Sequence, residues 1–329
     1  MSPLKSMKAA FRDHYVSTDL VQVRTLPIPE PKPKEIQVKV VATTINRTDM
    51  AVVTGWPWIM RLFVGLPNPK SPVPGTDFVG VISAVGSNEK GFKIGDKVWG
   101  FIDNGCGSHA EYFCTSSYSN LRKIPDGIDW KSAVGSIEGV HYAYNFINKM
   151  TLHPGNNVLV IGGTGAIGSA AIQILKSMGV LVTAISLGHV DRVKELGADR
   201  VIDGSQGDWT QFVGQFDAVF DAVGKSRFKI CKPLLKENGV YISSELGPNW
   251  ENPFLAIKSG FMGKKKVKFP VPTNVRESLE EIGQLLLKGK FHPLIDKTVA
   301  LDEISKAYTY VHSGKKIGNV ILEISQDKF

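Results

Sequence analysis

Cysteine is scarce in this sequence: its 329 residues include only Cys106, Cys114 and Cys231. Three scattered thiols cannot form the disulfide framework that supports small secreted domains. The sequence also lacks an apolar run long enough to span a membrane, and its first residues, MSPLKSMKAAF, lack the apolar core of a signal peptide. We therefore expect a cytoplasmic protein with reduced cysteines and no membrane partner.

Basic residues interleaved with aromatic ones, which are typical of nucleic-acid-binding surfaces, are also missing. The formal net charge is +8, but the only dense basic run is Lys264-Lys265-Lys266 plus Lys268, and no aromatic residue alternates with these charges. The run is more typical of a solvated turn than of an RNA site. The excess of positive charge still favours anionic small molecules through long-range steering.

A glycine-rich motif follows a short apolar run at the middle of the chain. The run is Val158–Ile161, and the motif consists of Gly163, Thr164, Gly165, Ala166, Ile167 and Gly168. In a G-x-G-x-x-G sequence the first glycine permits a tight turn, the second lets the backbone approach a pyrophosphate, and the third lets helix and strand pack closely. Because a helix over 169–178 and a second strand over 179–185 complete a βαβ unit, we interpret the motif as a dinucleotide-binding loop.

Further alternation of strands and helices predicts a doubly wound parallel sheet. Later strands are expected at 201–202, 216–224 and 239–244, with helices between them. Ligands of such sheets bind at the carboxyl ends of the strands. The residues placed there, and so expected to contact the cofactor, are Ser186, Val223, Gly224, Ser243 and Ser244.

The residues after the second strand bear on the choice of cofactor. NAD-preferring folds place an acid about 20 residues beyond the glycines. Here the segment from Ala184 to His189 contains no acid, and the first acid after it is Asp191. Ser186 could donate a hydrogen bond to a 2′-phosphate, and the guanidinium of Arg192 suits a phosphate by its fork of donors. We therefore predict NADP(H). The alternative for Arg192 is a solvated helix residue, and His189 could also supply positive charge.

The rest of the chain is predicted to be mostly β-structure. Strands are expected over 7–24 and 35–45, and alternating apolar residues with glycine turns over 75–101 indicate a small twisted barrel. Trp56 and Trp58 could form a lid or pocket wall, or could cap the core. From about residue 266 strands and helices alternate again up to residue 322.

Several sequence segments together resemble the medium-chain dehydrogenase/reductase superfamily, in its zinc-independent quinone oxidoreductase-like branch. They are PGTDFVGVISAVGS, GFKIGDKVWGF, HAEYF, KIPDGIDW and the glycine motif, in that order along nearly the whole chain. The resemblance implies an α/β fold, with a Rossmann dinucleotide-binding domain at 123–265. A mostly β, GroES-like barrel catalytic domain would comprise residues 1–122, with 266–329 returning to it.

The same resemblance implies a function and further site residues. It implies NADPH-dependent, zinc-free reduction of a quinone or an α,β-unsaturated carbonyl by hydride transfer, carried out by a homodimer joined near residues 254–269. Asn46 is the candidate for orienting the carboxamide or substrate, or else it holds a loop turn. His141 lies where the family reaches the nicotinamide, or it is a hydrogen-bonded histidine lining a crevice. Asn319 is a further candidate cofactor contact.

No metal is expected. Zinc alcohol dehydrogenases of this superfamily have a cysteine in the loop that here reads Thr44–Asp49 and a His-Glu pair where this chain has Thr76-Asp77. Alternatives to the quinone or enone reductase are a zinc-free alcohol dehydrogenase or enoyl reductase, and a non-enzymatic protein that binds dinucleotide with RNA or serves a structural, crystallin-like role.

Overall fold

A computed structural model describes residues 5–116, 118–206, 208–261, 263–269 and 271–326. The chain divides into two compact units. The mixed-sheet unit comprises residues 1–137, 274–287 and 295–329, and the parallel-sheet unit comprises 138–273 and 288–294.

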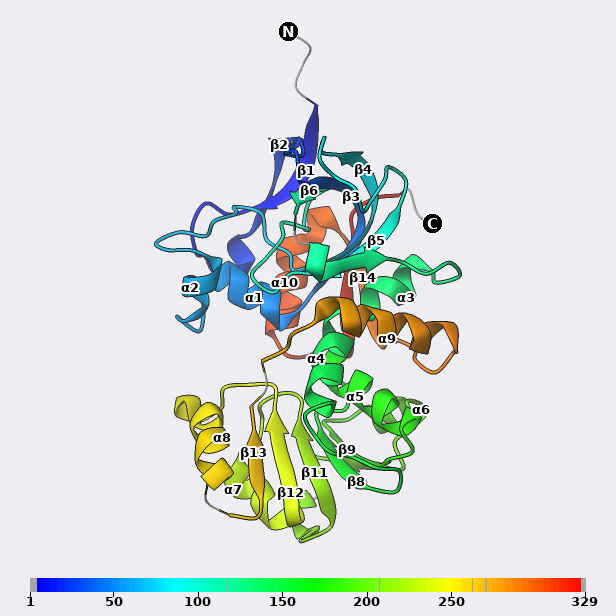
Figure 1. The fold of residues 1–329 in the computed structure, drawn as a ribbon. Coiled ribbons are helices and arrows are strands. Elements are labelled where there is room, and N and C mark those ends of the chain that lie inside the picture. The colour runs from blue at the N-terminus through cyan, green and yellow to red at the C-terminus, as the bar shows by residue number, and fades with distance from the viewer. Residues whose placement is uncertain (1–4, 117, 207, 262, 270, 327–329) are drawn as a thin grey trace. The chain divides into compact units, whose positions relative to one another are not determined.

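The parallel-sheet unit contains a six-stranded parallel sheet in the order β10-β9-β8-β11-β12-β13 (Figure 1). Its strands are β8 (Asn157–Ile161), β9 (Leu181–Ser186), β10 (Arg200–Asp203), β11 (Phe216–Asp221), β12 (Leu235–Ser243) and β13 (Lys266–Lys268). From β8 the chain continues through β9 to β10 at one edge of the sheet. It then returns to β11, beside β8, and continues through β12 to β13 at the other edge. Right-handed crossovers therefore place helices on both faces, which is the predicted doubly wound sheet.

The helices of this unit follow the strands closely. They are α4 (Glu138–Ile147), α5 (Ala166–Ser177), α6 (Val190–Glu195), α7 (Phe228–Cys231) and α8 (Glu251–Phe261). Helix α5 packs against α4 and strands β8 and β9, whereas α8 packs against β13. The buried face of α5 is mainly apolar and includes Ala170, Ala171 and Leu175.

The mixed-sheet unit is organised around the ten-residue strand β3 (Ile36–Ile45), which is buried along nearly its whole length. Strands β15 (Asn319–Glu323), β4 (Asp77–Val85) and β6 (Tyr112–Thr115) all pair with it antiparallel. The sheet continues through β5 (Lys97–Phe101), β7 (Leu121–Lys123) and β14 (Ile295–Ala300), and β1 (Ser6–Phe11) and β2 (Gln22–Pro27) form a separate hairpin.

Helices cover this sheet at its ends. They are α1 (Arg47–Thr54), α2 (Met60–Val64), α3 (Trp130–Gly135), α9 (Val275–Leu287) and α10 (Ile304–His312). Helix α10 supplies Tyr308 and Val311 to a core that also contains Ile45 and Val320. The expected fold class, a Rossmann sheet plus a mostly β, GroES-like domain, is confirmed.

The division of the chain differs from the expected boundaries at 122/123 and 265/266. Helix α3 belongs to the mixed-sheet unit because it packs on β3, β4 and β15. The helical segment 130–147 consists of two helices, α3 and α4, separated at Ser136 and Ile137. Strand β13 belongs to the parallel-sheet unit because it pairs with β12. The expected helix before Leu235 is short, because Pro233 lies in a 3₁₀ turn and β12 starts at Leu235.

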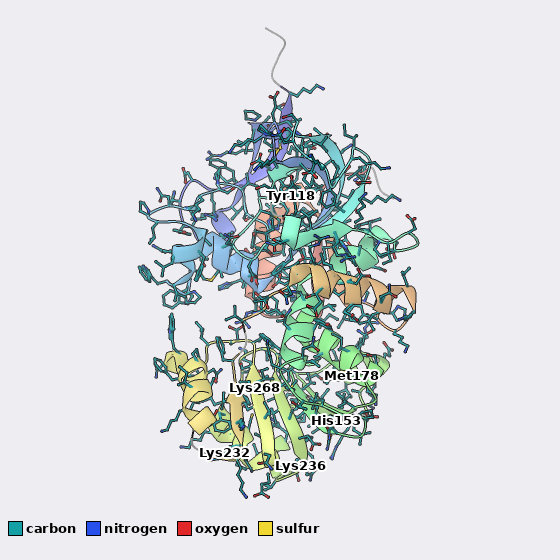
Figure 2. All side chains as sticks on the ribbon, in the orientation of Figure 1. Tyr118, His153, Met178, Lys232, Lys236 and Lys268 are labelled. Atoms are coloured by element: carbon teal, nitrogen blue, oxygen red, sulfur yellow. The ribbon has the colours of Figure 1, made fainter. Side chains whose placement is uncertain are left out.

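The lysines of the basic run contact protein acceptors in the parallel-sheet unit. Lys264 forms an ion pair with Glu237, Lys265 donates to the Lys232 carbonyl over 2.9 Å, and Lys268 donates to the Lys149 carbonyl (Lys232 and Lys268 are labelled in Figure 2). Lys264 and Lys265 precede β13, and Lys266 and Lys268 lie on that strand, so only part of the run is the solvated turn that the sequence predicted. Within the described ranges, no helix has both the length and the apolarity required to cross a bilayer.

Candidate cofactor site and the polar cluster of the mixed-sheet unit

The glycine loop between β8 and α5 has the shape that close approach of a phosphate requires. The left-handed turn falls on Gly162 (φ 89°), one residue before the motif, rather than on Gly163 as the sequence predicted. Gly165 precedes the first turn of α5, whose leading N–H groups have no partner within the helix. A β-carbon at Gly168 would overlap the Gly162 carbonyl oxygen, so the third glycine is required for helix–strand packing.

The ends of β11 and β12 meet this loop. A β-carbon on Gly162 would lie 2.5 Å from Cγ1 of Val223, so Val223 packs directly on the turn. Asp221 fixes the segment by accepting the Gly224 N–H at 2.8 Å. Ser243 Oγ accepts the Glu245 N–H at 3.2 Å. Ser244 Oγ is buried and has no hydrogen-bond partner among the described protein groups.

Ser186 lies at the carboxyl end of β9, where its hydroxyl donates to the Gly188 carbonyl at 2.7 Å. Strand pairing places Asp203, the last residue of β10, beside Ser186. Asp203 accepts the Gly188 N–H at 3.3 Å, and its hydrogen bonds to Ser205 hold the pKa of its carboxyl below the usual 3.8. The sequence pattern does not single out Asp203, although this acid directly follows the strand predicted over 201–202.

Arg192 lies on the short helix α6, and its side chain is half exposed. Its Nη1 is 3.6 Å from Glu195 Oε2 of the same helix, and the two side chains are 52% and 66% exposed. A phosphate would have to compete with this exposed ion pair. The contacts thus correspond to the alternative interpretation of Arg192, a solvated helix residue, and its role toward the cofactor stays a prediction.

His141 is a buried residue of α4, with 1% of its surface exposed. Asn145 Oδ1 accepts the Thr273 N–H at 3.1 Å, which orients the Asn145 amide so that Nδ2 donates toward His141 Nδ1 at 3.3 Å. The ring hydrogen is therefore on Nε2. Burial lowers the pKa of His141 to about 4, so the imidazole is neutral near pH 7. It can donate one hydrogen bond, but it does not hold an extra proton.

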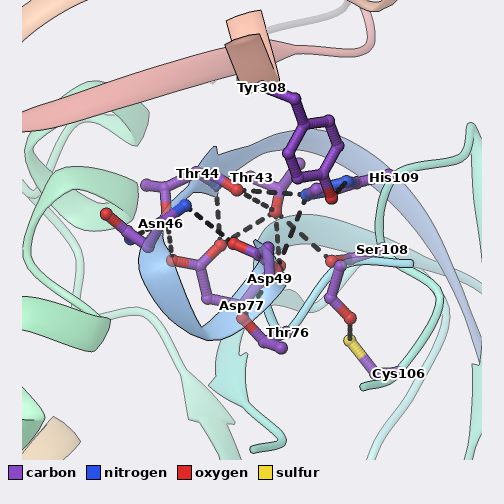
Figure 3. Close-up of polar contacts among 11 residues, drawn as sticks. Thr43, Thr44, Asn46, Asp49, Thr76, Asp77, Cys106, Ser108, His109 and Tyr308 are labelled. Carbon is purple, nitrogen blue, oxygen red and sulfur yellow. Dashed lines mark hydrogen bonds and ion pairs between the residues drawn. The ribbon is translucent and has the colours of Figure 1, made fainter. Parts of the chain in front are cut away.

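Asn46 lies in a cluster of buried polar side chains at the end of β3 (Figure 3). Its Nδ2 donates to Thr44 Oγ1 at 2.6 Å, and its Oδ1 accepts from Lys316 Nζ at 3.2 Å. Both ends of the amide thus have protein partners, and only 3% of Asn46 is exposed. The proposed role in orienting a substrate stays a prediction. No sequence motif points to Lys316, which precedes the strand that carries Asn319.

Two buried carboxylates form the centre of this cluster. Asp49 Oδ2 accepts the Asn46 N–H at 2.9 Å and Oδ1 accepts the Thr76 hydroxyl at 2.9 Å. Asp77 Oδ1 accepts the Thr44 N–H at 2.7 Å. Burial raises the pKa of both carboxyls, and the nearby Asp77 charge adds to the effect on Asp49, whose pKa rises to about 8.

His109 and Tyr308 complete the cluster beside Asp49. His109 Nε2 lies 3.1 Å from the Thr44 carbonyl, which can only accept, so Nε2 carries the hydrogen and Nδ1 accepts from the Tyr308 hydroxyl at 3.1 Å. Burial lowers the pKa of His109 to about 4, so the ring is neutral beside Asp49. The neutral imidazole and the phenol therefore extend the hydrogen-bond network around the two carboxyls without adding a charge.

Asn319, at the start of β15, donates from Nδ2 to the Gly135 carbonyl at 2.9 Å and is 3% exposed. This contact joins β15 to the end of α3 within the mixed-sheet unit. It gives Asn319 a structural function, whereas its predicted contact with a cofactor is not tested by this geometry.

The two segments compared with zinc ligands, the loop Thr44–Asp49 and the pair Thr76-Asp77, both contribute side chains to the cluster just described. No group of three or more His, Cys, Asp or Glu residues suited to a metal ion occurs in the described part of the chain. All three cysteines are free, and burial raises the pKa of the Cys106 thiol to about 12 and that of Cys114 to about 11. Neither is a thiolate near neutral pH.

A parallel sheet with a glycine loop at its strand ends defines a dinucleotide-binding α/β protein. Two family models match the chain: "Alcohol dehydrogenase GroES-like domain" over residues 32–160 and "Zinc-binding dehydrogenase" over 196–322. The chain belongs to the medium-chain dehydrogenase/reductase superfamily, in its quinone oxidoreductase-like branch, which confirms the resemblance.

Relatives with stated functions cover nearly the whole chain. A 2-methylene-furan-3-one reductase of Solanum lycopersicum is 28% identical over 96% of this chain and 79% of its own length. A chloroplast envelope quinone oxidoreductase homolog of Arabidopsis thaliana is 29% identical over 91% of this chain and 92% of its own. The quinone oxidoreductase structure from Coxiella burnetii superposes with a TM-score of 0.86 at 23% identity, over 98% of this chain and all of that one, and shows the same fold.

Proposed function

We propose that this protein is an NADPH-dependent, zinc-free oxidoreductase that reduces a quinone or an α,β-unsaturated carbonyl by hydride transfer. The proposal depends chiefly on the glycine loop, against which Val223 packs. The unpartnered Ser244 hydroxyl lies just beyond the end of a neighbouring strand. Relatives named as quinone oxidoreductases and as an NADPH-dependent alkenal/one oxidoreductase support the substrate class.

The residues of the parallel-sheet unit fit a dinucleotide. The first turn of α5 would hold the pyrophosphate, and the ends of β9, β11 and β12 would hold the nucleosides. When bound, the nicotinamide supplies the hydride. Positioning is then the chief contribution of the chain, since a reduced quinone can take its proton from water. His141, neutral with its hydrogen on Nε2, can donate a hydrogen bond.

Turnover of a substrate panel tests this proposal. We expect NADPH oxidation with quinones or enones and no reduction of NADP⁺ by simple alcohols, because the cysteine and the His-Glu pair that hold the catalytic zinc of the alcohol dehydrogenases are absent from the sequence. Overnight dialysis against a chelator should leave this activity and the fold unchanged. About one zinc per chain with loss of activity on chelation would refute zinc independence, and absence of turnover with every quinone and enone would refute the enzymatic proposal.

The role of Asn46 is tested separately. We expect Asn46→Ala to lower kcat with the accepted substrate, whereas Asn319→Ala should chiefly lower the thermal midpoint through the lost contact with Gly135. Full turnover by Asn46→Ala with each accepted quinone would leave only the structural role that its contacts with Thr44 and Lys316 describe.

A further inference from the structure

A buried arginine in the mixed-sheet unit lacks a counter-ion. Arg12 follows β1 directly and is 3% exposed. Its Nε and Nη1 are buried, and neither donates to any protein group that the structure describes. The centroid of the Tyr15 ring lies 5.5 Å from Arg12 Cζ. No ion pair in the described ranges includes this guanidinium.

Such an arrangement is costly unless an anion accompanies it. A guanidinium stays protonated in proteins, and burying an unpaired charge costs several kcal/mol, so arginines in this position normally face a carboxylate or a phosphate. Burial lowers the pKa of Arg12, and the titratable groups that act on it are the phenols of Tyr308 and Tyr15 rather than an acid. The missing partner is thus not supplied by a nearby side chain.

Arg12 lines a small cavity of about 70 Å³, large enough for a few heavy atoms and far too small for a dinucleotide. The other lining residues include one cation, two neutral polar side chains, four apolar side chains and no acid. They are Lys70, Ser71, Asn104, Val52, Phe63, Val64, Val73 and Gly105. The cavity therefore combines positive charge and donors with a hydrocarbon wall.

Hydrogen bonds hold the walls of this cavity in place. The Arg12 N–H donates to the Pro72 carbonyl at 2.9 Å, and the Tyr15 hydroxyl donates to the Gly65 carbonyl at 2.6 Å. The Lys70 N–H donates to the Val64 carbonyl at 2.9 Å. The end of β1 and the segment 64–73 are thus tied together, so the cavity is preformed and a ligand pays little ordering entropy there.

We propose that this cavity binds the carboxylate of a small organic acid, with Arg12 as its principal partner and Lys70 as a second cation. The planar fork of a guanidinium matches a carboxylate in a bidentate way. The apolar residues Val52, Val64 and Val73 then cover a short hydrocarbon chain, which inorganic phosphate does not have. The site belongs to the mixed-sheet unit, whereas the glycine loop belongs to the other unit.

Calorimetric titration of the full chain with butyrate at constant ionic strength tests the proposal, with butyramide and inorganic phosphate as comparisons. Butyramide has nearly the same shape without the charge. We expect saturable binding of butyrate, a rise in thermal midpoint with its concentration, and at least tenfold weaker binding of both comparison ligands. No saturable binding of butyrate, or binding of butyramide or phosphate as tight as that of butyrate, would overturn the proposal.

Variants locate the site. Arg12→Met keeps an apolar stem and removes the charge, so we expect at least a tenfold loss of butyrate affinity. The matched control is Arg24→Met, because Arg24 is exposed and lies over the Phe11 ring. This control variant should bind butyrate as the parent does. If Arg12→Met does not fold, Lys70→Gln at the exposed rim replaces it, with an expected loss of several-fold. Unchanged butyrate affinity in the folded variant that is tested means that butyrate binds elsewhere, and the proposal fails.

Discussion

At the scale of single residues, the surroundings of three carboxyls shift their pKa values in different directions. Asp49 and Asp77 are buried at 0% exposure, and each accepts hydrogen bonds from backbone and hydroxyl donors. Asp203 instead lies at the end of a parallel strand and is partly exposed. Burial raises the pKa of the first two carboxyls, while hydrogen bonding lowers that of the third. Substitution of Asp49 should therefore change the pH dependence of stability, and substitution of Asp203 should change the cofactor preference.

Asp49→Asn should reduce the pH dependence of stability between pH 6.5 and 8. Because the folded-state pKa of Asp49 rises from 3.8 to about 8, the folded protein retains a proton that the unfolded chain has lost, and stability falls as the pH rises through this window. The slope is at most about 1.4 kcal/mol per pH unit for one proton. Urea unfolding at three pH values measures it.

Histidine effects on stability have the opposite sign. The folded-state pKa values of His109 and His141 are lowered to about 4 from 6.5, so their contribution to stability is lost as the pH falls through 6.5. Asp191→Asn, at an exposed acid of α6, is the matched control and should keep the parent slope. An unchanged slope in Asp49→Asn would show that its carboxyl is ionised at pH 6.5.

Asp203→Asn should increase the preference for NADPH over NADH. A carboxylate beside Ser186 repels a 2′-phosphate, with an energy on the order of 1 kcal/mol at 4 Å in a water-like medium, which is roughly fivefold in the ratio of kcat/KM values. Asparagine keeps the Oδ1 acceptor for the Gly188 and Ser205 N–H groups.

The control for this prediction is Glu237→Gln, which makes the same change in net charge near the start of β12. It should leave the cofactor ratio unchanged. A parent enzyme that uses NADH as well as NADPH would contradict the proposed preference itself, whereas an unaltered ratio in Asp203→Asn would show only that this carboxylate does not face the ribose.

At the scale of elements, two glycines of the β8–α5 connection have different functions, since Gly168 is needed for packing and Gly165 is expected to serve binding. Gly165 has φ −73°, which any residue adopts, and a β-carbon there would lie 3.4 Å from the Gly162 carbonyl oxygen, an ordinary contact. Gly168, in contrast, has no room for a methyl group against the backbone of Gly162. The two glycines of one motif thus meet different physical demands.

We expect Gly165→Ala to keep its thermal midpoint within about 1–2 °C while NADPH affinity falls at least tenfold, because the added methyl group lies where the pyrophosphate approaches. Gly168→Ala should destabilise the protein by about 1–3 kcal/mol through overpacking. Thermal unfolding and fluorescence titration with NADPH measure both effects. Unchanged NADPH affinity in Gly165→Ala would contradict the assigned function of the loop.

At the scale of the whole molecule, the edge of the parallel sheet bears on assembly. Strand β13 pairs with β12 on one side, and the adjacent helix α8 leaves Phe254 and Ile257 each 68% exposed. An edge strand beside exposed apolar side chains is typical of a surface that another copy covers. This observation supports the homodimer that family resemblance implies.

Light scattering should therefore give a dimeric mass for the parent chain and a monomeric mass for Phe254→Glu/Ile257→Glu. The reason is that two charges in the apolar centre of an interface are desolvated without partners. Leu20→Glu, at a comparably exposed site of the mixed-sheet unit (58%), is the matched control and should remain dimeric. A monomeric parent at working concentration would refute the dimer.

Much of the parallel-sheet unit could be predicted from the sequence because its signals are local. The apolar run of β8, the glycines and the helix after them are adjacent in the chain, and their order defines the βαβ unit. Boundaries were predicted less well. Nothing local to residues 130–149 says that α3 packs on β3 and β15 while α4 packs on α5, since both segments are helical and apolar.

The sequence by itself therefore determined the family, the dinucleotide loop and the missing zinc ligands of the alcohol dehydrogenases, all of which depend on residue types at fixed spacings. Only the tertiary structure decided which side chains from distant parts of the sequence lie close together. Strand register brought Asp203 beside Ser186, and chain return brought Lys316 to Asn46 across 270 residues. Packing buried Arg12 without an acid. These effects depend on distances and dielectric environment, which a linear pattern does not encode.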